Sequence, residues 1–115
     1  MQTKTIKINE EPINVRIANT FCSRFKGLMM EKSLPQGEAM ILDTKSIHMC
    51  FMRFPIDAVF LDKEGTVLET HEHLKPWVGT ATCMKATYVI ELPDRDITRL
   101  KIDIGQSIPV QELKS

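Results

Sequence analysis

The first 18 residues of the chain alternate between polar and apolar side chains in the manner of β-strands. Residues 5–9 and 13–18 each follow a period of two, and residues 9–12 between them are rich in turn formers. Val15 and Ile17 fall on one face of the second of these segments. The pattern therefore predicts a hairpin at the start of the fold.

Helical periodicity replaces this alternation in residues 19–30. Apolar side chains recur there at i, i+4, i+7 and i+8, the spacing of one helix face, and they are Phe21, Phe25, Leu28 and Met29. We expect a short amphipathic helix that begins at a cap residue, Asn19 or Thr20, and ends before residues 34–37. A second helix of one or two turns is expected in residues 94–100.

The remaining apolar segments are short enough to be strands. They span residues 39–42, 47–52, 56–61, 66–71 and 88–92, and residues 102–105 with 107–110 form one final strand. Residues 56–61 are apolar on both alternating faces, which is typical of a strand covered on both sides. Residues 62–65 are predicted to form a turn that ends in glycine. Residues 74–84 contain proline, glycine and the only tryptophan, and they are predicted to be irregular.

Seven or eight short strands with one or two short peripheral helices indicate a mainly β protein. A compact sandwich or a barrel-like antiparallel fold fits this order, because the strand–helix alternation of a parallel sheet is missing. The 115 residues have the usual size of one domain, and we see no linker, repeat or low-complexity segment. We expect residues 1–115 to form a single domain.

The charge balance removes the simplest argument for a nucleic-acid partner. Fifteen Lys and Arg residues balance fifteen Asp and Glu residues, so no net field would attract phosphates or an anionic membrane. The apolar runs are shorter than the ~20 residues that cross a bilayer, and the first residues lack the apolar stretch of a signal peptide. Three widely spaced cysteines suit free thiols. The sequence predicts a cytoplasmic protein with neither a nucleic-acid nor a membrane partner.

Several short motifs resemble those of one family, the domain of unknown function 192 family. Residues 24–29, Arg-x-x-Gly-Leu-Met, match one motif, and residues 51–62 with His48 ahead of them resemble the central signature. Later blocks are similar at Gly65-Thr66-Val67, Pro76-Trp77, residues 89–93 and Gly105. The resemblance covers roughly residues 15–110. It implies a compact β-sandwich or barrel with peripheral helices, but it implies no reaction.

Two segments depart from the family pattern. Residues 39–42 read Ala-Met-Ile-Leu where Gly-Met-Leu-Phe is common, and Asp94-Arg95 replaces the usual Ala-Gly after Leu92-Pro93. The second change alters a turn. The resemblance therefore does not extend to a site built on the backbone of that turn.

Asp57 is the candidate site residue that most needs an explanation. It lies between apolar neighbours on a strand that is predicted to be buried, where a carboxylate is costly unless it is paired or hydrogen-bonded. One interpretation is a structural aspartate that binds backbone N–H groups of the loop after Pro55. The other is a ligand-facing carboxylate with Arg24, Arg53 or His48 as its partner.

The sequence gives less support to a metal site or a nucleophilic cysteine than to a role for Asp57. His48, Cys50 and Met52 would share a strand face and raise the question of a Cu(I) or zinc site, but Cys and Met are common core fillers. His71 and His73 would also share a face, without a convincing third ligand nearby. His48 and Cys50 are some 7 Å apart along a strand, which is long for a thiolate–imidazole pair. We expect no metal and no other cofactor.

Two functional hypotheses fit these residues. In the first, the chain is a small-ligand-binding module whose pocket, at one end of the β fold, is lined by His48, Asp57 and Trp77, with Arg24 as a further member. In the second, it is a small hydrolase or lyase with Asp57 or His48 as acid or base. Trp77 has an alternative role as a lid over the core, and Arg24 as a surface cation. A metal-binding protein and a purely structural or interaction domain are the remaining possibilities.

Overall fold

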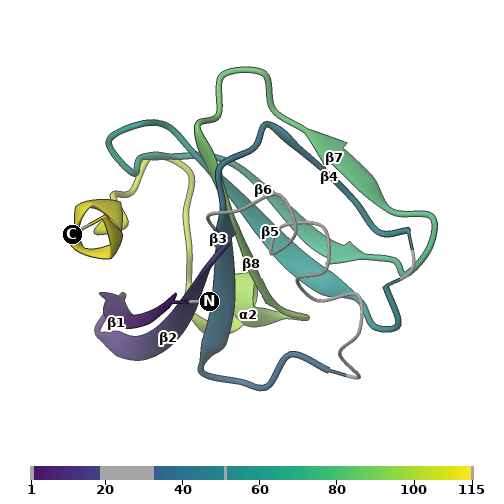
Figure 1. Cartoon of the computed structure of the whole chain (residues 1–115), viewed down its shortest axis with the longest axis horizontal. Coiled ribbons are helices and arrows are strands. Elements are labelled where there is room, and N and C mark those ends of the chain that lie inside the picture. The colour runs from purple at the N-terminus through teal and green to yellow at the C-terminus, as the bar shows by residue number, and fades with distance from the viewer. Residues whose placement is uncertain (1, 19–32, 51, 115) are drawn as a thin grey trace.

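The structure is a computed structural model that describes residues 2–18, 33–50 and 52–114, and it is mainly β (Figure 1). Its strands are β1 (Gln2–Ile8), β2 (Glu11–Ala18), β3 (Glu38–Leu42), β4 (Ser46–His48), β5 (Ile56–Leu61), β6 (Val67–Leu74), β7 (Thr80–Thr82) and β8 (Tyr88–Pro93). Helix α2 (Asp96–Arg99) and the 3-10 helix η1 (Val110–Leu113) follow. The amphipathic helix predicted for residues 19–30 lies outside the described residues.

Six of the described strands form one sheet in the order β1-β2-β3-β8-β5-β6, and β4 and β7 form a separate two-stranded ribbon. Neighbouring strands of the large sheet are antiparallel except β2 and β3, which are parallel. The long connection between Ala18 and Glu38 allows the crossover that a parallel pair needs. Because β1 and β6 stand at two separate edges, the fold is sandwich-like and is not a closed barrel.

The large sheet is covered on both faces. On the ribbon face, Ile47 of β4 and Ala81 of β7 share a buried core with Phe60 of the sheet. On the opposite face, here called the helix face, Ile97 of α2 shares a second core with Val59, and the C-terminal segment contributes to it. The ribbon and the C-terminal 3-10 helix lie on opposite sides of the molecule (Figure 1).

Strand β5 confirms the prediction of a strand covered on both sides. All six of its residues are buried. Ala58 and Phe60 point to the core of the ribbon face, whereas Val59 and Leu61 point to the core of the helix face. The lack of polar alternation in this segment is thus explained by two cores and not by an edge or a membrane.

Two predictions around the ribbon are wrong. Strand β4 ends at His48 and does not continue to residue 52, because the Met49 carbonyl accepts hydrogen bonds from the N–H groups of Met52 and Trp77 and a turn begins there. Residues 80–82, expected to be irregular, form β7 opposite β4. Strands β4 and β7 have three residues each, so neither is long enough to show a clear alternation in the sequence.

The predicted final strand is also wrong. Residues 102–110 contain turns and a single bridge from Thr66 to Ser107. Gly105 has a φ of +95°, which breaks an extended run, and Pro109 has no N–H for a ladder. The segment is held on the sheet by individual bonds, such as the one from the Ile108 N–H to the Gly65 carbonyl at 2.9 Å.

Helix α2 confirms the second predicted helix, and with four residues it has about one turn. Arg99 at its end contacts the Asp96 carboxylate at 2.8 Å and also pairs with Glu11 of β2, so the helix is tied to the first hairpin. The bond to Asp96 raises the pKa of Arg99. In the described part of the chain, α2 and the other helical segments are too short or too polar to cross a membrane.

Candidate functional site

Asp57 is fully buried and is bonded to the backbone. Its Oδ1 accepts a hydrogen bond from the His73 N–H, and its Oδ2 accepts one from the Ile97 N–H, each at 2.9 Å. These charge-assisted bonds offset the cost of burying the carboxylate, and they join β5 to β6 and α2. The contacts are those of a structural aspartate, but its partners belong to β6 and α2 and not to the loop after Pro55.

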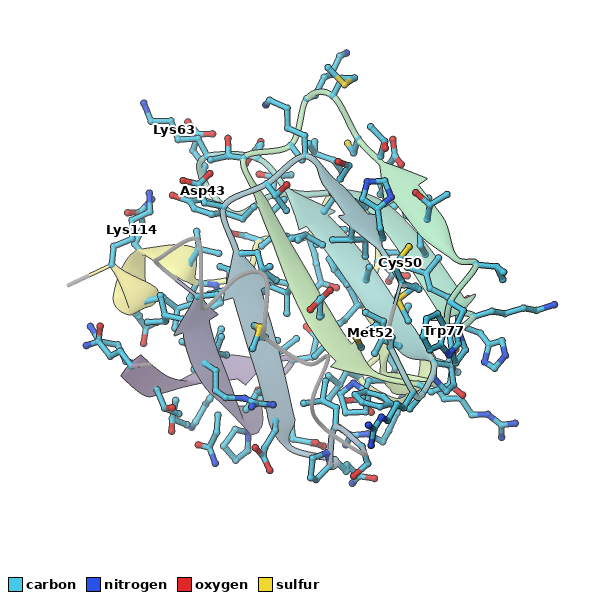
Figure 2. All side chains as sticks on the ribbon, turned by 45° about the vertical axis from the view of Figure 1, so that its right-hand side comes forward. Asp43, Cys50, Met52, Lys63, Trp77 and Lys114 are labelled. Carbon is cyan, nitrogen blue, oxygen red and sulfur yellow. The ribbon has the colours of Figure 1, made fainter. Side chains whose placement is uncertain are left out.

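The other predicted site residues lie on the ribbon side or outside the described residues. His48 is exposed on β4, and its Nδ1 is 3.2 Å from the Thr80 hydroxyl. Trp77 lies in the turn between β6 and β7, and 56% of its surface is exposed. Its side chain is on the same side of the molecule as Cys50 (Figure 2). Arg24 lies outside the described residues.

The large sheet separates Asp57 from His48 and Trp77. Asp57 points to the helix face, where the Ile97 N–H reaches it, whereas the other two residues belong to the ribbon layer on the opposite face. The described residues therefore do not bring the three side chains into one pocket. Sequence alternation assigns a residue to a face, but it does not say which layer covers that face. The separate roles of these residues in binding stay predictions.

His71 and His73 each contact a different carboxylate. The Nε2 of His71 is 2.9 Å from Glu69, and its ring packs edge-on against Phe60 on the ribbon face. The Nδ1 of His73 is 2.9 Å from Asp94 on the other side of the sheet. His73 has a φ of +53° and follows a register shift in the β5–β6 pairing, which breaks the expected alternation. Among the described residues, no group of three acidic, His or Cys side chains could hold a metal ion.

A polar pocket of about 340 Å³ lies beside Asp57. It is lined by Asp57, Glu72, His73, Asp94 and Arg95. The His73 side chain is 57% exposed, so water screens its contact with Asp94. Asp94 and Arg95 form the turn at which the chain departs from the family pattern. This pocket is therefore a weak candidate for a site that relatives would share.

A second pocket, here called the end pocket, lies where β2, β3 and β8 meet the C-terminal 3-10 helix. Its volume is about 190 Å³. It is lined by Ile17, Ala18, Ile41, Leu42, Asp43, Tyr88, Val110, Leu113 and Lys114. Its apolar walls come from the ends of two parallel strands and from the short helix, whose Val110 and Leu113 are buried. An apolar concavity with a few polar groups is the usual form of a small-molecule site.

Charged groups surround the mouth of the end pocket. The Lys114 ammonium lies 4.9 Å from the centre of the Tyr88 ring, in the geometry of a cation–π contact. Asp43 follows β3 and lines the pocket with its exposed side chain. Lys63 lies at the same corner of the molecule as Asp43 and Lys114 (Figure 2). The turn that carries Lys63 also carries Asp62 and Glu64, so Lys63 adds no net positive charge there, and Lys114 is the cation that lines the pocket itself.

Sequence reasoning missed the polar residues of the end pocket. Asp43, Tyr88 and Lys114 lie far apart in the chain, and each has an ordinary surface role when it is considered alone. The antiparallel pairing of β3 with β8 and the position of the C-terminal helix bring them together. The one available signal was Asp43, a charged residue directly after the apolar segment 39–42.

Comparisons with known proteins agree on one family. The model of the domain of unknown function 192 family, described as uncharacterised, matches residues 4–110. A UPF0127 protein of Thermococcus sibiricus is 36% identical over 99 residues, 82% of this chain and 64% of that protein. A UPF0127 protein of Pyrococcus furiosus is 34% identical over 108 residues, 89% of this chain and 90% of that protein. The chain spans less than two thirds of the Thermococcus relatives it matches.

Two crystal structures share the fold. A Sinorhizobium meliloti protein, described as a proposed transcription regulator, has a TM-score of 0.80 at 22% identity and aligns over 92% of this chain and 89% of its own. A Novosphingobium aromaticivorans protein of unknown function has a TM-score of 0.79 at 19% identity, over 92% of this chain and 81% of its own. At these identities the likeness concerns the fold alone.

Proposed function

Because the chain belongs to the domain of unknown function 192 family, which is described as uncharacterised, we propose its function from its own pockets: it is a small-ligand-binding module, and its site is the end pocket. The observation that carries this proposal is a concave site with buried apolar walls and charged groups at its mouth. Such a combination favours a ligand with an apolar body and a polar head.

The size of the end pocket limits the ligand. Its volume of about 190 Å³ is below the roughly 300–1,000 Å³ of sites for drug-sized molecules, so the ligand has a short apolar body. Ile41 and Leu113, both nearly fully buried, would contact that body without a change in the fold.

The position of Lys114 favours an anionic head. Its ammonium group lies over the Tyr88 ring, and Lys114 is the cation among the residues that line the pocket. An anionic head would meet Lys114 directly, and the apolar stem of that lysine can lie along the pocket wall. We therefore propose a short-chain carboxylate or a similar anion as the ligand class.

Titration with butyrate, observed by methyl NMR, tests this proposal. We expect saturable chemical-shift changes at the methyl groups of Ile17, Ile41 and Leu113, because the apolar body would pack on them. Butylamine, which has the same body and a cationic head, should bind more weakly. The variant Lys114→Gln should weaken butyrate binding by roughly two- to fivefold, the usual worth of one exposed charge.

Lys75→Gln is the matched control, since Lys75 is exposed in the turn before Trp77, outside the residues that line the end pocket. It should leave butyrate binding unchanged. Equal binding of butyrate and butylamine would contradict the anionic head. Chemical-shift changes centred away from the end pocket would contradict the site itself.

We also propose a cytoplasmic location. Among the described cysteines, the exposed Cys50 and the buried Cys83 are both free thiols. Free thiols are usual in a reducing compartment. The balanced net charge supports a small-molecule ligand over a nucleic-acid partner.

A further inference from the structure

The end pocket carries two charged groups of opposite sign. Among the described residues that line it, Lys114 and Asp43 are charged, and both are exposed. Lys114 follows the 3-10 helix, and its ammonium lies 4.9 Å from the centre of the Tyr88 ring. Asp43 follows β3. A simple carboxylate ligand would use the positive group and leave the negative one without a role.

The strand register brings Asp43 close to Lys114. Strands β3 and β8 are antiparallel, and their pairing reaches Leu42 and Val89. The register continued by one position places Asp43 opposite Tyr88, at a usual Cβ separation of about 4.5–5.5 Å and on the same face of the sheet. Asp43 therefore lies beside the ring that carries the Lys114 ammonium. Figure 2 shows Asp43 and Lys114 at the same corner of the molecule.

The two charged groups do not neutralise each other. In the part of the chain that the structure describes, neither Asp43 nor Lys114 takes part in an ion pair. The Lys114 ammonium contacts the face of an aromatic ring, and its three N–H groups include donors that can still bind an anion. The Asp43 carboxylate can accept hydrogen bonds from a cation. Both ends of a dipolar head group thus have a partner at this mouth.

We infer that the end pocket binds a zwitterion, a small α-amino acid with a short aliphatic side chain. Its carboxylate binds the Lys114 ammonium and its ammonium group binds the Asp43 carboxylate. Its side chain packs on the buried Ile41 and Leu113. This inference rests on the proposed function, and it narrows the ligand class to short carboxylates that also carry an amino group.

The shape of an α-amino acid suits such a pocket. Its two charged groups are attached to one carbon, so both stay at the exposed mouth and keep much of their hydration while the side chain enters. The volume of about 190 Å³ limits that side chain to a few carbon atoms. Each exposed ion pair should strengthen binding roughly two- to fivefold.

Titration of the whole chain with L-2-aminobutyrate and with butyrate, followed by methyl NMR, tests the inference. The two ligands share the apolar body and the carboxylate, and they differ in the amino group. We expect L-2-aminobutyrate to bind roughly two- to fivefold more tightly than butyrate, because it gains the contact with Asp43. D-2-aminobutyrate should bind with a different affinity, because three contacts distinguish the two hands of a ligand.

Variants of Asp43 show whether its carboxylate causes the preference. Asp43→Asn should lower the affinity for L-2-aminobutyrate to that for butyrate, whereas Asp43→Glu, which keeps the charge, should retain a preference. Glu112→Gln is the matched control, since Glu112 is an exposed acidic residue of the same 3-10 helix that does not line the end pocket. It removes one negative charge near the mouth and should leave the preference unchanged.

The possible outcomes separate this inference from the proposed function. If neither ligand binds at the end pocket, the proposed function fails and the inference fails with it. If butyrate binds there but L-2-aminobutyrate binds no more tightly, only the inference is overturned. A preference that persists in Asp43→Asn, or equal affinities of the two enantiomers, would also overturn it.

Discussion

At the scale of single residues, the sequence indicated that a buried carboxylate needs partners but not which ones. The apolar neighbours of Asp57 predicted its burial correctly. Its partners are backbone N–H groups of His73 and Ile97, which lie 16 and 40 residues away. Every non-proline residue carries such a donor, so no residue type marks it in a sequence.

Replacing Asp57 by alanine should strongly destabilise the fold. The substitution removes two charge-assisted hydrogen bonds and leaves two backbone donors without their partner, which predicts a loss of about 3 kcal/mol or more in the free energy of unfolding. Urea denaturation followed by circular dichroism measures this loss. Asp103→Ala, at an exposed aspartate, is the control and should change stability by no more than about 0.5 kcal/mol. A loss of similar size in both variants would show that the Asp57 bonds do not hold β6 and α2.

At the scale of elements, the sequence predicted the strands whose burial leaves a clear pattern. The first hairpin shows alternation because one face of it is buried, whereas β5 is an unbroken apolar run because both of its faces are buried. The three-residue strands β4 and β7 are too short to show a period. Residues 102–110 contain apolar residues, as a strand does, but the segment is made of turns. Only some of its side chains pack in the core of the helix face.

Gly65 should be essential for the docking of that C-terminal segment. It has a φ of +94°, and an added Cβ would lie 2.2 Å from the Ile108 carbonyl oxygen. Gly65→Ala therefore adds a clash to backbone strain and should cost about 3 kcal/mol or more in the free energy of unfolding. Gly37→Ala is the matched control: its φ is +91° but its Cβ would meet nothing within 4 Å. Only the strain of about 1–2 kcal/mol is expected there. Thermal denaturation compares the two, and equal losses would contradict the predicted clash.

At the scale of the whole molecule, the expectation of a single domain is open to a direct test. The strands of the large sheet come from both ends of the chain, and its two cores share β3, β5 and β8. One cooperative unfolding transition is therefore expected, with near- and far-ultraviolet circular dichroism changing together. Two separated transitions would show that the ribbon side and the helix side unfold as independent units.

The central claim is that the end pocket binds a short molecule with an anionic head. A crystal structure grown with butyrate tests it most directly. The account predicts butyrate density between Ile41 and Leu113, with its carboxylate at Lys114, and an otherwise unchanged fold. Density for butyrate elsewhere alone, or an end pocket that stays empty at saturating butyrate, would contradict the claim.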